Sequence, residues 1–336
     1  MGTRLHDWFL ATWYGESSRG LWLLPASWLF GAIARLRRAL YAWGWLPRYR
    51  SRRPVVVVGN LTVGGTGKTP FVVWLARELR RRGFGVGVAL RGYGGAGGPA
   101  RLVSAADSAA TVGDEALLVA RKLECPVAIA RRRAEAVRLL EDACDVIICD
   151  DGLQHYALAR DVEVAVVDAV RRFGNGRLLP AGPLREPAFR LDSVDAVVVN
   201  GQGFDWPSSM RMEVEPVAVI ALRDGSRRPL SDYSGQEVIA IAAIGNPERF
   251  FALLREHGLR VESRVLPDHA RFTPAEAGAA AGRTLLMTEK DAVKCTGDGW
   301  GDAGYLEVQA RVEGPAASGL LERIASLAAQ PKGKLK

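Results

Sequence analysis

The glycine-rich segment LTVGGTGKTP, at residues 61–70, follows four consecutive valines. Backbone N–H groups that converge at the start of a helix bind anionic oxygens, and glycines let the chain turn closely enough for this. The pattern is close to GxxxxGK[ST], which holds the phosphates of a nucleoside triphosphate, although Thr62 occupies the first glycine position. We therefore predict a phosphate loop for ATP made of Thr62, Val63, Gly64, Gly65, Thr66, Gly67, Lys68 and Thr69.

Carboxylates that could bind a metal ion occur in ICDDGLQH, at residues 148–155. An aspartate at the end of an apolar strand is typical of the Walker B arrangement, which places a carboxylate beside Mg²⁺. We predict that Asp150 and Asp151 bind Mg²⁺ together with the Thr69 hydroxyl, while Lys68 contacts the phosphates during catalysis. The spacing does not distinguish which aspartate binds directly, and a plain Asp-Gly turn is the alternative. His155 would support these ligands or orient their loop.

Strands and helices alternate from residue 54 onward, so these residues must be positioned by an α/β fold. Short apolar runs predict buried strands at 55–59, 86–90, 126–130, 145–150, 162–168 and 195–200. Helical periodicity covers 69–82, 114–123 and 131–142. This order predicts a doubly wound parallel sheet of the P-loop NTPase type, with ligands beyond the carboxyl ends of the strands.

The pattern changes after about residue 205. Segments 210–222 and 228–235 are predicted as connecting strands, and a second α/β unit follows. It has strands at 237–245 and 283–291, a helix between Asn246 and Gly258, and a terminal helix in the last twenty residues. The predicted parts are a helical segment at 1–50, a nucleotide-binding domain at 51–209, linker strands at 210–235, and a smaller α/β domain at 236–336, with a cleft between the domains.

Six of the nine tryptophans lie within the first 45 residues, and a run of arginines follows them. Indole rings favour the headgroup level of a bilayer and arginines favour anionic lipids. Segment 1–50 is therefore predicted to associate with a membrane surface as a peripheral or monotopic element, since its apolar stretch is short and interrupted by proline. The alternative is a helical pair packed on the domain.

The net charge of +8 and the pI near 9.6 favour an anionic partner. No nucleic-acid-binding module is recognisable, so nucleic acid is not expected as a partner. The four cysteines form neither a CxxC pair nor zinc-type spacing, which favours reduced thiols in a cytosolic setting. They are Cys125, Cys144, Cys149 and Cys295.

Eight motifs, taken together and in order, resemble the tetraacyldisaccharide 4′-kinase family over nearly the whole chain. They are LTVGGTGKTP, RGYGG (91–95), VGDEALL (112–118), CDDGLQHYALARD (149–161), FGNGRLLPAGPLREP (173–187), AAIGNPERFF (242–251), LPDHARFT (266–273) and LLMTEKDAVK (285–294). The resemblance implies an ATP-dependent kinase that phosphorylates the 4′-hydroxyl of an acylated glucosamine disaccharide 1-phosphate, forming lipid IVA. It also implies a location on the cytoplasmic face of the inner membrane of Gram-negative bacteria.

The resemblance further implies that Asp114 and His269 act together as the catalytic pair. A carboxylate bonded to an imidazole can accept the proton of the attacking sugar hydroxyl. If the resemblance is set aside, the sequence favours a helix N-cap for Asp114 and a surface loop residue for His269. The substrate-contacting candidates are Arg185 and Glu186, and more weakly Tyr93, Gln154 and Asn175.

Two other functions are compatible with a phosphate loop. A GTPase-like switch would need a guanine-reading NKxD motif. TEKD at 288–291 matches this motif only partly, and its Lys290 and Asp291 are not placed against an identifiable guanine pocket. A soluble small-molecule kinase would leave the aromatic N-terminus without a use.

Overall fold

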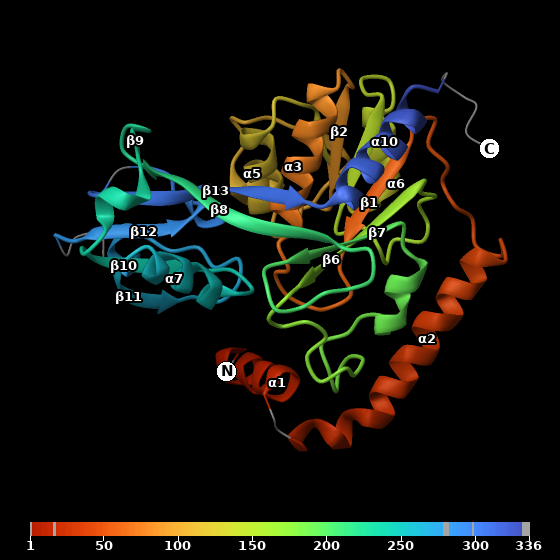
Figure 1. Ribbon diagram of the computed structural model, residues 1–336, viewed down its shortest axis with the longest axis horizontal. Coiled ribbons are helices and arrows are strands. Elements are labelled where there is room, and N and C mark those ends of the chain that lie inside the picture. The colour runs from red at the N-terminus through yellow and green to blue at the C-terminus, as the bar shows by residue number, and fades with distance from the viewer. Residues whose placement is uncertain (1, 16–17, 278–281, 298, 331–336) are drawn as a thin grey trace.

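The computed structural model describes residues 2–15, 18–277, 282–297 and 299–330 (Figure 1). A nearly all-parallel array forms the first half of its sheet, in the order β7-β6-β1-β5-β2-β4-β3, with only β3 antiparallel to its neighbour. These strands are β1 (Val55–Gly59), β2 (Val86–Leu90), β3 (Arg101–Val103), β4 (Val127–Ile129), β5 (Val146–Asp150), β6 (Val162–Asp168) and β7 (Ala196–Asn200). The predicted strands of this region are confirmed, and β3 is an additional strand that was not predicted.

Helices cover both faces of this half. Alternate residues of β1 enter different cores, since Val56 and Val58 pack with one set of helices and Val55 and Val57 with the other. The first core contains α3 (Lys68–Arg81), α4 (Ala109–Val112) and α5 (Asp114–Lys122); the second contains α6 (Arg133–Leu140). The predicted doubly wound α/β fold is therefore confirmed.

A long antiparallel pair carries the sheet onward. Strand β8 (Met210–Ala221) lies parallel to β7 on one side and pairs on its other side with β13 (Ala303–Glu313). The pairing runs from Gly304 opposite Ala221 to Glu313 opposite Arg211, with one register shift after Glu307. Figure 1 shows these two strands crossing from one half of the molecule to the other.

The second half of the sheet extends from β13 through β12 and β10 to β11. Its elements are β10 (Glu237–Ala242), α7 (Pro247–Glu256), β11 (Arg260–Val265), α8 (Pro274–Ala277), β12 (Thr284–Thr288) and α9 (Glu289–Ala292). Asn246 precedes α7 and Pro247 begins it, as predicted, although the Asn246 side chain makes no capping hydrogen bond. Strands β11 and β13 were not predicted from the sequence.

Two predicted strands need correction. Segment 228–235 contains only the end of β9 (Arg227–Arg228) and a 3-10 turn at Leu230–Tyr233, because Pro229 lacks the N–H that a strand ladder uses. Segment 283–291 ends as a strand at Thr288. The Thr288 side chain accepts a hydrogen bond from the Asp291 N–H, and this cap starts α9.

The terminal helix α10 (Pro315–Ala328) returns to the first half of the molecule. Its buried Leu320, Leu321 and Ile324 belong to the same core as Phe71 of α3. A division at residues 236–336 thus separates α10 from the core in which it packs. The boundaries at 51–209 and 210–235 remain predictions.

The N-terminal segment forms α1 (Gly2–Tyr14), a 3-10 turn at Ser18–Leu23 and α2 (Leu24–Ala42), which lie along the rim of the molecule in Figure 1. Ser27 holds α2 in place, because its hydroxyl donates to the Leu178 carbonyl and accepts from the Ala181 N–H. None of the helices in the described residues is long and apolar enough to span a bilayer. The four cysteines are free thiols, as expected.

Replacing Ile324 with alanine tests the packing of α10. This side chain is fully buried against the first half, so we expect its truncation to lower the free energy of unfolding by about 2–5 kcal/mol. Glu322→Ala, on the exposed side of the same helix, is the matched control and should change stability by less than about 0.5 kcal/mol. Urea unfolding followed by circular dichroism measures both. Equal effects would show that α10 is not part of this core.

Candidate active site

The predicted phosphate loop links the buried strand β1 to the start of α3. The chain passes through Gly67 in the left-handed region, with φ of 89°, before the helix begins at Lys68. A Cβ atom on Gly67 would lie 2.1 Å from Nδ2 of Asn200, whose amide donates to the Thr66 carbonyl. Glycine is therefore required here for both backbone conformation and close packing. The loop has the strand–loop–helix context that phosphate binding needs.

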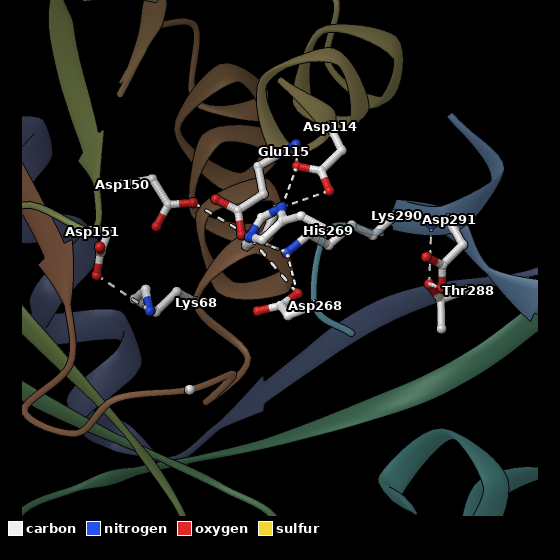
Figure 2. A network of polar contacts seen from close by, with 12 residues as sticks. Lys68, Asp114, Glu115, Asp150, Asp151, Asp268, His269, Thr288, Lys290 and Asp291 are labelled. Atoms are coloured by element: carbon white, nitrogen blue, oxygen red, sulfur yellow. Dashed lines mark hydrogen bonds and ion pairs between the residues drawn. The ribbon is translucent and has the colours of Figure 1, made fainter. Parts of the chain in front are cut away.

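The Lys68 ammonium is held beside the loop by two oxygen atoms. Its Nζ donates to Oδ1 of Asn60 at 3.1 Å. It also forms an ion pair with Asp151 at 3.3 Å (Figure 2). Asn60 also donates to the Thr62 carbonyl, so one side chain connects the lysine to the loop backbone. Asn60 was not predicted from the sequence, because it lies one residue beyond β1 and outside the glycine pattern.

Asp150 and Asp151 lie together at the carboxyl end of β5 but have different electrostatic environments. Burial, reinforced by the nearby Glu115 carboxylate, raises the pKa of Asp150 to about 6. Burial also opposes ionisation of Asp151, but Lys68 and Arg185 outweigh it and hold the pKa of Asp151 well below its usual range. Asp151 is therefore a stable anion, whereas the charge of Asp150 responds to its surroundings.

The donor set of Thr69, Asp150 and Asp151 fits Mg²⁺. Oδ2 of Asp150 accepts a hydrogen bond from the Thr69 hydroxyl at 3.3 Å, while Oδ1 is buried without a partner among the described residues. An orphaned carboxylate oxygen beside a hydroxyl is suited to a hard cation. The described residues contain no cluster of three or more His, Cys, Asp or Glu side chains arranged around a metal position.

A buried arginine behind this strand end was not predicted. Arg133, at the start of α6, donates from Nη2 to the Asp150 carbonyl at 2.7 Å, and burial lowers its pKa. Its Nε and Nη1 have no hydrogen-bond partner within the described part of the chain. Burial, and then the Arg133 charge, lower the pKa of His155 to about 4. His155 is therefore a neutral side chain near the carboxylates.

Asp114 and His269 are brought together from the two halves of the molecule (Figure 2). Asp114 is the first residue of α5, and His269 follows β11 with a positive φ of 63°. The His269 Nδ1 atom lies 2.9 Å and 3.1 Å from the two oxygens of Asp114. Without the family resemblance, nothing in the sequence predicts this contact across 155 residues.

The pair is electrostatically coupled. Burial opposes ionisation of Asp114, but its hydrogen bond with His269 and the charge of Lys290 lower its pKa overall. The same hydrogen bond raises the pKa of His269, against burial and Lys290. The Tyr93 ring packs against the imidazole, with centroids 4.9 Å apart. Asp114 is thus the anionic member of the pair, and Tyr93 limits the positions open to His269.

The other predicted substrate residues fall into two groups. Arg185 forms an ion pair with Asp151 at 3.3 Å, and Gln154 donates to both the Asn60 carbonyl and Glu186. Arg185, Gln154 and Glu186 therefore lie beside the carboxylates and the phosphate loop. Asn175 lies elsewhere: its amide donates to the carbonyls of Thr12 and Ala181, and so fastens α1 to its loop.

A second arginine joins the halves and was also missed. Arg249 of α7 donates from Nη2 to Asn200 at 2.6 Å and from Nη1 to Asp168 at 3.3 Å. Asn200 in turn donates to the Thr66 carbonyl. The second half of the molecule is therefore connected to the phosphate loop through one buried amide.

The doubly wound sheet, the glycine loop and the carboxylates at the end of β5 define a P-loop nucleotide-binding protein. Comparisons with known proteins make the class specific. The family model described as LpxK, Tetraacyldisaccharide-1-P 4'-kinase, matches residues 19–326. The chain belongs to this family, and the resemblance carried by its eight motifs is confirmed.

Named relatives cover nearly the same length. The chain is 47% identical over 312 residues to a tetraacyldisaccharide 4'-kinase of Pseudomonas aeruginosa (strain LESB58), covering 91% of this chain and 93% of that one. It is 48% identical over 318 residues to one from Aeromonas hydrophila subsp. hydrophila, covering 93% and 94%. A crystal structure of LpxK from Aquifex aeolicus in complex with ATP is 30% identical, with a TM-score of 0.77 over 92% of this chain and 99% of that one.

A Gly67→Ala substitution tests the phosphate loop. The added methyl group would displace Asn200 from the Thr66 carbonyl, so we expect the affinity for an ATP analogue to fall at least about tenfold. Gly83→Ala is the matched control, because Gly83 has φ of 87° but open space around a Cβ atom. It should cost only about 1–2 kcal/mol of stability and leave nucleotide affinity unchanged. Calorimetric titration measures both, and equal affinities would contradict the assignment.

Proposed function

We propose that this protein is an ATP-dependent kinase that transfers the γ-phosphate to the 4′-hydroxyl of tetraacyldisaccharide 1-phosphate, forming lipid IVA in lipid A biosynthesis. The observation that carries the proposal is the contact between Asp114 and His269 in a chain that also has the phosphate loop and belongs to this kinase family. A proton acceptor beside a nucleotide site is what transfer to an alcohol requires.

Residues 62–69 would bind the phosphates through their backbone N–H groups, with Lys68 countering the charge on the transferred group. Thr69, Asp150 and Asp151 would hold Mg²⁺, which when bound neutralises charge on the phosphate oxygens. The two carboxylates suit different parts of this task. Asp151 keeps its negative charge through Lys68 and Arg185, while Asp150 has the unpartnered oxygen.

Proton transfer would be the work of Asp114 and His269. When His269 is neutral, its Nδ1–H donates to the Asp114 carboxylate, and the pair carries one negative charge. In that state it can accept the proton of the 4′-hydroxyl as the oxygen attacks phosphorus. When His269 is protonated, the imidazolium neutralises the carboxylate and makes it a poorer base. The pair should therefore act above the pKa of His269, which its bond to Asp114 raises.

The acceptor would contact the side of the site formed by Arg185, Glu186 and Gln154, with Tyr93 next to the base. Arg185 already faces Asp151 and could shift to a phosphate oxygen, because a guanidinium matches phosphate geometry. Asn175 would contribute indirectly, by holding the loop that carries Arg185.

The acceptor is a lipid, so the protein would work at a membrane surface. Trp22, Trp28 and Trp45 are 71%, 69% and 74% exposed, and the neighbouring Leu29 and Ile33 of α2 are also exposed. Exposed indoles beside arginines are suited to the headgroup region of an anionic bilayer. We infer peripheral association with the cytoplasmic face of the inner membrane, and no role for nucleic acid.

A phosphotransfer assay tests the activity. Labelled γ-phosphate from ATP should appear in the acylated disaccharide presented in detergent micelles. Lys68→Ala should reduce kcat at least about a hundredfold by removing a charge from the transition state. Asp114→Ala and His269→Ala should each reduce it by about 10²–10⁴ through loss of the proton acceptor. The unsubstituted protein should lose rate as pH falls through the pKa of His269, because protonation removes the base. Full activity in Lys68→Ala would exclude this nucleotide site.

Liposome flotation tests the membrane surface separately. The triple substitution Trp28→Ser, Leu29→Ser and Ile33→Ser should greatly reduce recovery with anionic vesicles, since it removes apolar side chains that would enter the lipid. The matched control replaces three exposed apolar residues elsewhere, namely Leu102, Leu139 and Val265, with serine. It should float like the parent. Equal flotation of both triples would show that α2 is not the membrane-binding element.

A further inference from the structure

The TEKD segment at 288–291 is not accounted for by the roles described above. Asp291 is fully buried, and its carboxylate accepts hydrogen bonds from the Ala243 N–H and the Thr288 hydroxyl. Lys294 pairs with its other oxygen at 2.6 Å. Asp291 is thus committed within the second half and cannot read a nucleotide base. Its structural role is to fix the first turn of α9.

That turn directs the two central residues of the segment towards the first half of the molecule. Glu289 pairs with Lys122 of α5 through both carboxylate oxygens, at 2.6 Å and 2.7 Å. Lys290 reaches Glu115 of the same helix, with its Nζ 3.1 Å from Oε1. The two residues form neighbouring ion pairs to α5, but only Lys290 also reaches His269.

The surroundings of Lys290 keep it charged. Its Nζ lies 3.5 Å from Oδ1 of Asp268 and 3.5 Å from Nε2 of His269, and its side chain is only 17% exposed (Figure 2). Burial alone would lower its pKa, but Glu115, Asp268 and Asp114 raise it above its ordinary value. An ammonium has three donors and no acceptor. The Nε2 atom facing it must therefore offer a lone pair, which means that it carries no proton.

We propose that Lys290 is a positioning residue that keeps Nε2 of His269 unprotonated, so that the Asp114–His269 pair rests in its proton-accepting state. The proposal deepens the kinase function described above and depends on it for its catalytic meaning. Its effect on the imidazole does not depend on that function. Asp268 explains why such a residue is needed: its Oδ1 lies 3.7 Å from Nε2 and would otherwise stabilise a proton there.

The balance of charge around His269 supports this role. Asp114 and Glu115 face it from α5, and Asp268 precedes it in the chain. Two cations oppose these three carboxylates: Lys290 of α9, and Lys294, which lies just beyond the end of α9 and whose charge acts on Asp114. The Tyr93 ring covers another side. Removing Lys290 leaves three carboxylates against a single, more distant ammonium, so the imidazolium form becomes more stable.

Proton NMR of the imidazole rings tests the proposal without an activity measurement. The chain has only four histidines, so His269 can be assigned by comparison with His269→Gln. In Lys290→Met the titration midpoint of His269 should move to higher pH, and in Lys290→Arg it should stay near that of the parent. Lys290→Gln serves as a second neutral variant in case the methionine variant does not fold.

Lys122→Met is the matched control, because it removes the neighbouring ion pair to α5 but has no contact with His269 among the described residues. It should lower thermal stability and leave the His269 midpoint unchanged. A midpoint that stays or falls in both neutral Lys290 variants would overturn the proposal. A rise of the same size in Lys122→Met would also overturn it, by showing that the effect comes from weaker docking between the halves.

Kinetics provide the second readout. When the pH is lowered from alkaline to acidic values, the kcat of Lys290→Met should fall about tenfold further than the kcat of the parent. The reason is that the base in this variant is protonated at a higher pH. Lys290→Arg should keep the pH profile of the parent. If neither the parent nor any variant transfers phosphate, the proposed kinase function is wrong, but the NMR result still decides whether Lys290 keeps Nε2 of His269 unprotonated. If the parent is active but the neutral variants keep its pH profile, the role of Lys290 fails and the function stands.

Discussion

The hydrogen bond between Asp114 and His269 is the interaction on which the proposed chemistry of this molecule depends. It joins α5 in the first half of the sheet to the segment that follows β11 in the second half. Each half contributes one member of the proposed proton-accepting pair, so the contact requires a fixed relative position of the halves. The β8–β13 pair provides this, because eleven residues of β13 continue one sheet across both halves. The helix α10, which follows β13 at once, is anchored in the first core.

Ion pairs reinforce the same alignment. Lys122 with Glu289, Lys290 with Glu115, and Arg249 with Asp168 all cross between the halves. The pair of Lys122 with Glu289 is largely buried on both sides. A buried ion pair adds little net stability compared with apolar packing, but breaking it leaves an uncompensated charge. This pair therefore penalises misaligned arrangements of the halves more than it stabilises the correct one.

The parts of this site that sequence can predict are those built from neighbouring residues. The phosphate loop follows from glycines between a strand and a helix, and Asp150 from its place at the end of an apolar run. The contact of Asp114 with His269 came only from the family resemblance, because no periodicity links α5 to a loop 155 residues away. Arg133, Arg249 and Lys290 were missed for the same reason. A charged residue in the first turns of a helix looks like a solvated one until the partner elements are known.

The fold shows the same limit. Strands with continuous valines were predicted because burial on both faces leaves a clear pattern. Strand β11 was missed because most of its residues are exposed at the sheet edge, and β13 because its alternation is interrupted by the register shift after Glu307. Segment 228–235 was wrongly predicted as a strand. The three-residue spacing of Leu230 and Tyr233 places them on one side of a helical turn but on opposite faces of a strand, and Pro229 also favours the turn.

One loop connects the exposed helix α2 to the phosphate site. Leu178, near its beginning, accepts the Ser27 hydroxyl of α2, and the Pro183 carbonyl accepts the Val63 N–H at 2.8 Å. Helix α1 adds a second contact, since the Tyr14 hydroxyl donates to the Val63 carbonyl. The exposed aromatic surface and the phosphate loop are thus held by the same short segment. If α2 lies on a bilayer, this segment fixes the position of the phosphate loop relative to the lipid surface, because it is bonded to both α2 and that loop.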